Sequence, residues 1–75
     1  MNNDELLKEL KNMQVGLKGL AARAVINYIV TELSEIGSAS NEEVSVILRN
    51  ALSLLEIEED DIHRVKEFIR KMINQ

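Results

Sequence analysis

The residue best equipped for chemistry in this sequence is its one histidine, His63. It lies four residues after Glu59 and four residues before Glu67. On a helix these three side chains share one face, an arrangement that would suit a metal site or a pH-dependent switch. Ordinary pairing of carboxylates and an imidazole on a solvated helix face produces the same spacing. We therefore expect neither a metal nor catalysis at His63.

Four consecutive acids, from Glu58 to Asp61, form a second candidate site, in this case for a cation. An EF-hand loop needs alternating oxygen ligands, a glycine at its sixth position and a glutamate at its twelfth. The run has none of these features. Because acids stabilise the positive N-terminal end of a helix, we interpret the run as the beginning of a helix.

Nucleophilic catalysis lacks its usual groups. The chain has no cysteine and one histidine, so a serine nucleophile would depend on carboxylates for activation. No glycine-rich phosphate loop follows a strand, and a small helical bundle has little room for a substrate pocket of about 300 Å³ or more. We expect no enzyme activity, no cofactor and no metal.

Nucleic-acid binding is the main alternative, because two helices joined by a short turn can read DNA. The charge balance is +1 in residues 1–30, −8 in residues 31–61 and +3 in residues 62–75. A reading helix that began at Glu58 would point acids at the phosphates, which would repel them. The basic face could make only a weak phosphate contact, so we do not expect nucleic acid as a partner. This face consists of Arg64, Lys66, Arg70 and Lys71.

Length and composition predict a single helical domain, residues 1–75. Hydrophobic residues make up 45% of the chain, there is no proline, and three glycines are present. This composition favours folded, long helices with short connections. The acidic, polar start does not resemble a signal peptide, and no stretch of about 20 apolar residues could span a membrane. We expect a cytoplasmic protein.

The first helix is predicted to begin with Asn3 or Asp4 as its N-cap. Its apolar row stays in phase through Gly16 and Gly19, so one helix could extend from about residue 4 to residue 36. That helix would be about 50 Å long, whereas a compact domain of this size is about 30 Å across. We therefore favour a break, with helices near 4–15 and 17–36, and reserve the unbroken helix for a dimer. The row comprises Leu6, Leu10, Met13, Leu17, Leu20 and Ala24.

Residues 17–36 are apolar around almost the whole helix, which is typical of a buried, central helix. Gly37 should end it as a C′ residue, and Ser40 with Glu43 should start the third helix with a capping box. We place a fourth helix after Ile57, with its own core-facing side. That side would contain Ile62, Val65, Phe68, Ile69, Met72 and Ile73.

The predicted fold is all-α: a small, mostly antiparallel four-helix bundle with a buried central helix at about residues 17–36. The predicted function is a small acidic protein–protein interaction module with a regulatory, inhibitory or adaptor role, which acts as a homodimer, binds a protein partner, or both. A helix-turn-helix transcriptional regulator is the alternative, and a small helical enzyme subunit is the third class. The residues predicted to add to an interface are Leu7, Val15, Val46 and Leu54.

Overall fold

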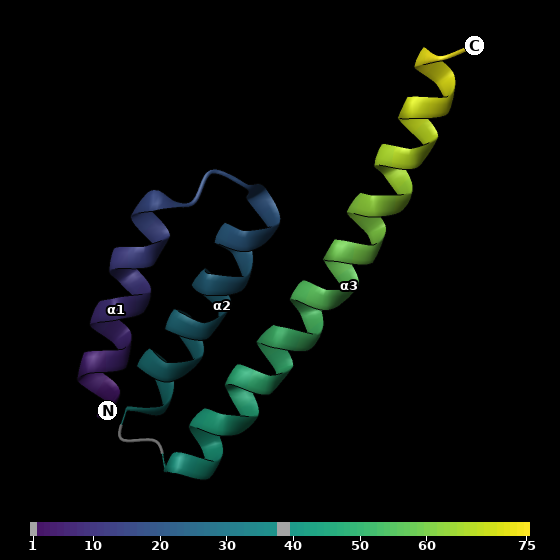
Figure 1. Cartoon of the computed structure of the whole chain (residues 1–75). Coiled ribbons are helices and arrows are strands. Elements are labelled where there is room, and N and C mark those ends of the chain that lie inside the picture. Colours follow the sequence, from purple (N-terminus) through teal and green to yellow (C-terminus); the bar gives the residue numbers. More distant parts are fainter. Residues whose placement is uncertain (1, 38–39) are drawn as a thin grey trace.

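The computed structural model describes residues 2–37 and 40–75. Within these ranges the chain forms three helices, α1 (Asn3–Gly16), α2 (Leu20–Ile36) and α3 (Asn41–Ile73), and no strand (Figure 1). The predicted all-α class is confirmed. The predicted four-helix bundle is wrong, because the expected third and fourth helices are one helix of 33 residues.

The continuity of α3 has a local cause. No glycine or proline occurs between Asn41 and Ile73, so nothing in this stretch interrupts the backbone hydrogen bonds. Glu58 to Asp61 lie in the middle of the helix, and the acids near its N-terminus are Glu42 and Glu43. Glutamate is a good helix former and aspartate costs little more than other polar residues. The acidic run is therefore compatible with a helix interior, and it does not mark a new helix start.

The break between α1 and α2 is confirmed, at residues 17–19. The N-cap of α1 is Asn2 and not Asn3 or Asp4, because the Asn2 Oδ1 accepts a hydrogen bond from the Glu5 backbone N–H at 2.8 Å. Leu17 is extended, with φ −82° and ψ 133°. The second helix therefore begins at Leu20 and not at residue 17.

The cap residues around the second connection are confirmed. Gly37 has φ 75°, a left-handed value that glycine tolerates best, and its N–H donates to the Leu33 carbonyl at 3.3 Å. The Ser40 Oγ accepts from the Glu43 N–H at 3.2 Å, and the Glu43 Oε1 accepts from the Ser40 N–H at 3.1 Å. This capping box sets the starting point of α3.

The core lies along α2, which packs against both α1 and α3 and lies between them in Figure 1. Leu33, at 1% exposure, is the most deeply buried residue. The helix is central but not buried all round, since Leu20 is 85% exposed at its first turn. Four of the seven buried residues come from α2, and the set is Leu10, Val25, Ile26, Ile29, Leu33, Ile47 and Ala51.

The chain is elongated, with extents of 55 × 23 × 18 Å and a radius of gyration of 15.8 Å. A compact chain of this length would have a radius of gyration near 11 Å, estimated from typical domains. The difference arises because α3 extends far past the ends of α1 and α2 (Figure 1). Every residue from Glu56 to Gln75 is exposed. We call α1, α2 and residues 41–55 the bundle half, and residues 56–73 the projecting half of α3.

None of the three helices combines the length and the apolar character that a crossing of the membrane requires, among the residues that the structure describes.

Candidate interaction surfaces

The candidate catalytic residues lie on open surface. His63, Glu59 and Glu67 are all exposed on the projecting half of α3. Among residues 2–37 and 40–75, no group of three or more His, Cys, Asp or Glu side chains is arranged to hold a metal ion. Glu67 instead accepts a hydrogen bond from Arg70, with Nη1 and Oε1 2.8 Å apart. This contact is an exposed ion pair at i, i+3 spacing, of the kind that stabilises a helix only slightly.

The predicted basic residues all lie on the projecting half, where Lys66 borders the apolar side chains Ile62 and Ile73 at about 100° per residue. Lys66 and Arg70 occupy one flank of the helix and Arg64 and Lys71 another, at about 100° per residue. All four are exposed. The helix-turn-helix considered for this region would need a turn near Ile57, and α3 passes through that position without interruption.

The four residues predicted for an interface do not form one patch. Leu7 is half-buried on α1 and packs against the core, whereas Val15, at 88% exposure, lies at the other end of that helix. Val46 lines a shallow hollow of about 380 Å³ with Ile36 and Glu42. Leu54 is also exposed on α3. These residues are spread over two helices, and the structure does not bring them together.

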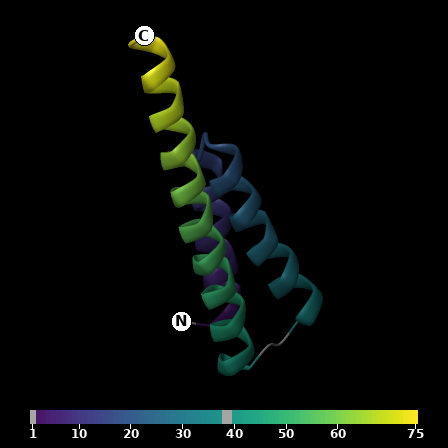
Figure 2. The same ribbon diagram turned by 90° about the vertical axis from the view of Figure 1, so that its right-hand side faces the viewer.

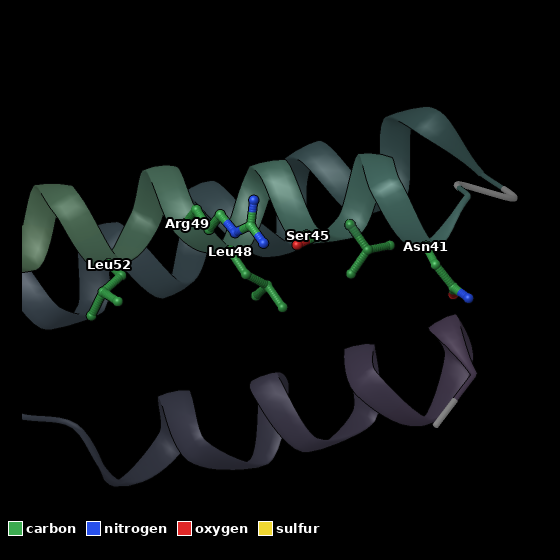
Figure 3. A pocket seen from close by; sticks show the side chains of 6 residues that line it. Asn41, Ser45, Leu48, Arg49 and Leu52 are labelled. Atoms are coloured by element: carbon green, nitrogen blue, oxygen red, sulfur yellow. The ribbon is translucent and has the colours of Figure 1, made fainter.

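An open groove lies beside the first turns of α3 and holds about 320 Å³. Figure 3 shows Leu48 and Leu52 extending from α3 on the side of α1. The backbones of α1 and α3 each lie close to that of α2 and farther from each other, which leaves the groove open on this side of the bundle half. The lining residues are Asn41, Val44, Ser45, Leu48, Arg49 and Leu52.

One exposed apolar surface consists of residues that were predicted to face the core. The predicted inward side of a fourth helix is instead solvent-exposed on the projecting half. We call this surface the apolar face of α3, and it consists of Ile62, Val65, Phe68, Ile69, Met72 and Ile73. Phe68, the chain's one phenylalanine, is 61% exposed. Apolar side chains gathered on one exposed face mark an interaction site more often than scattered ones do.

The apolar face of α3 continues the row that packs on α2. At about 100° per residue, Val44, Ala51 and Leu55 point in nearly the same direction as Ile62 and Ile69. The first three are wholly or partly buried, and the last two are exposed. The uninterrupted stretch from residue 41 to residue 73 is the sequence signal that could have revealed this surface, because no neighbouring helix is long enough to cover it.

Comparison with family models, with curated proteins and with solved structures finds no match to this chain.

Proposed function

We propose that this chain is a small protein–protein interaction module, and that the apolar face of α3 is its binding surface. Its role is regulatory, inhibitory or adaptor-like, and its compartment is the cytoplasm. The observation that supports this proposal is the exposure of six large apolar side chains on one side of a helix that leaves the bundle (Figure 2).

Large apolar side chains that are exposed to water lose the free energy that burial would provide. Each large apolar side chain gains about 1.5–3 kcal/mol when it moves from water into a packed interface. The bundle half already holds the core, so the projecting half adds nothing to that core. An amphipathic helix that presents apolar side chains at i, i+3, i+4 and i+7 is a common means of binding another helix or a groove. Val65, Phe68, Ile69 and Met72 have this spacing.

A photo-crosslinking experiment in the native host tests the proposal. A photoreactive phenylalanine analogue replaces Phe68 on the apolar face, and in a matched control it replaces Val46, which is also exposed on α3 but in the bundle half. We expect covalent protein adducts from position 68 and few from position 46. The adducts should disappear when Val65→Asp and Ile69→Asp are added.

Two results would contradict the proposal. One is the absence of protein adducts at position 68. The other is adducts that persist in the aspartate variant, because binding would then not depend on the apolar face. Recovery of crosslinked DNA instead of protein would favour nucleic-acid binding as the function of this chain.

A further inference from the structure

We propose that the apolar face of α3 binds the same face of a second copy of this chain, with the two helices antiparallel and centred near Glu67. This inference rests on the proposed function and names the partner. In the pair, each projecting half lies along the other, and the helix of the second copy continues the line that α2 occupies in the bundle half.

The spacing of the apolar residues is self-complementary in this orientation. Ile62, Val65, Ile69 and Met72 alternate spacings of three and four, as in a two-helix coiled coil. Positions 62 and 72 are symmetric about residue 67, and so are positions 65 and 69. An antiparallel pair centred there places Ile62 opposite Met72 of the second copy, and Val65 opposite its Ile69.

The charge layout favours the antiparallel orientation. Each projecting half has acids at its start, Glu58 to Asp61, and the basic residues Arg70 and Lys71 at its end. A parallel pair would set acids beside acids and bases beside bases. In the antiparallel pair Lys71 of the second copy lies about two residues, roughly 3 Å along the axis, from the level of Asp61, so the acidic start of each helix lies near the basic end of the other.

The extent of the bundle half fits the same register. The cover that α2 provides ends near Leu55, since every residue from Glu56 onward is exposed. In the proposed pair Ile73 of the second copy lies opposite Asp61, so the second helix ends where the space beside α3 ends. The connection between α1 and α2 is on the same end of the bundle as the projecting half (Figures 1 and 2). Val15 and Leu20, two strongly exposed apolar residues, flank that connection and would lie near the end of the second helix.

Two residues lie next to their own symmetry mates in this arrangement. Phe68 flanks the centre on one side, so the two phenylalanine rings would pack together, which favours association. Lys66 flanks it on the other side, so two ammonium groups would lie close to each other. Lys66 is therefore the one position where removal of a charge should strengthen the pair.

Mass and disulfide mapping test the proposal on the full chain. Light scattering from low micromolar concentration upward should show a shift from 8.5 kDa to twice that mass. Because the chain has no cysteine, the variant Ile62→Cys/Met72→Cys reports only on the two introduced thiols. We expect disulfides between position 62 and position 72 of the second copy, identified by mass spectrometry of the linked peptides. In the antiparallel pair two copies of position 62 are about 15 Å apart along the axis, beyond the roughly 7 Å limit for Cα atoms in a disulfide.

Two substitutions sharpen the test. Phe68→Ala should weaken the dimer by about tenfold or more, and Lys66→Gln should strengthen it a few-fold.

Charge reversal at Glu59 and Asp61 should weaken the dimer, and reversal of Arg70 and Lys71 in the same chain should restore it. In a parallel pair each reversed group of charges would still face its own copy with like charge, so neither reversal should change the affinity of the dimer.

Disulfides linking 62 to 62 and 72 to 72 would overturn the antiparallel pair. A mass that remains at 8.5 kDa up to about 100 µM, a concentration far above the dissociation constant of a specific dimer, would overturn self-pairing altogether. Neither result contradicts the proposed function, which fails separately if position 68 captures no protein in the host. A hetero-partner would appear there as an adduct whose mass is not that of two copies of this chain.

Discussion

The two halves of α3 carry the same kind of apolar row and have opposite surroundings. In the bundle half the row packs against α2, and Ile47 and Ala51 are buried. In the projecting half the row continues in nearly the same direction, and every residue is exposed. Periodicity therefore identifies the apolar side of a helix, whereas the lengths of the neighbouring helices determine which part of that side is covered.

The halves also differ in what stabilises them. The bundle half has a core and a connection between α2 and α3 that is capped at both ends, by Gly37 and by Ser40. The projecting half has its backbone hydrogen bonds and the exposed pair between Glu67 and Arg70. Isolated helices of fewer than about 12–15 residues are marginal in water. The projecting half, residues 56–73, is only a little longer than this limit, so its stability depends on its connection to the bundle half and, in our proposal, on a second copy.

The largest expected difference comes from the same substitution in the two halves. Ile29→Asp places a carboxylate in the core, where Ile29 is 4% exposed, at a cost of several kcal/mol. We expect this variant to be unfolded. Ile69→Asp, in the projecting half, should keep the bundle folded, because its carboxylate remains in water. Circular dichroism melting curves at low micromolar concentration measure both.

Val46→Asp is the control within the bundle half. Val46 is exposed on α3, away from the core, and a charge there should change the free energy of unfolding by less than about 0.5 kcal/mol. Similar melting curves for the Ile29 and Val46 variants would show that α2 does not hold the core.

Hydrogen exchange should separate the two halves within the native protein. Small domains of this size have a stability of about 3–5 kcal/mol, so amides of α2 around Ile29 should exchange about a hundredfold or more slowly than free peptides. Amides of residues 59–73 should exchange rapidly at low protein concentration, and more slowly at concentrations where the dimer forms. Equal protection of both halves at low protein concentration would show that the projecting half is as stable as the bundle half, contrary to our expectation.

Loss of the capping box should lower stability by an intermediate amount. Ser40→Ala removes the hydroxyl that accepts from the Glu43 N–H, and such a loss costs about 1 kcal/mol. In a domain of this size the melting temperature should fall by about 5 °C. Asn74→Ala, at the opposite end of α3, is the matched control and should leave the melting temperature unchanged. A larger effect at Asn74 would mean that the C-terminal end of α3 unfolds together with the bundle half.

The smallest effect is expected from the ion pair in the projecting half. Glu67→Gln removes the partner of Arg70, and exposed pairs of this kind contribute about 0.3–0.5 kcal/mol. Chemical denaturation should give a free energy of unfolding within that margin of the parent chain. A loss of more than about 1 kcal/mol would place Glu67 in a contact beyond this pair.

Several features of the fold follow from short stretches of sequence. The absence of proline and the regular apolar spacing predict helices, and the prediction of an all-α chain is confirmed. Gly37 ends α2 and Ser40 with Glu43 starts α3 as expected, because caps depend on residues within one helical turn. The break before α2 is also confirmed, although the N-cap at Asn2 was predicted one or two residues too late and the start of α2 at Leu20 three residues too early.

The tertiary structure decided how many helices there are and which apolar faces remain open. The acids from Glu58 to Asp61 fit both the start of a helix and the interior of one. The local sequence therefore does not distinguish the two cases, and the rest of the structure does. Ile62 and Ile69 have the spacing of core residues, yet they are exposed because α2, with 17 residues, is about half as long as α3, with 33. Local residues determine where a helix is apolar and where it can end. Burial depends on a second element at the same level, and the position of that element is a property of the whole fold.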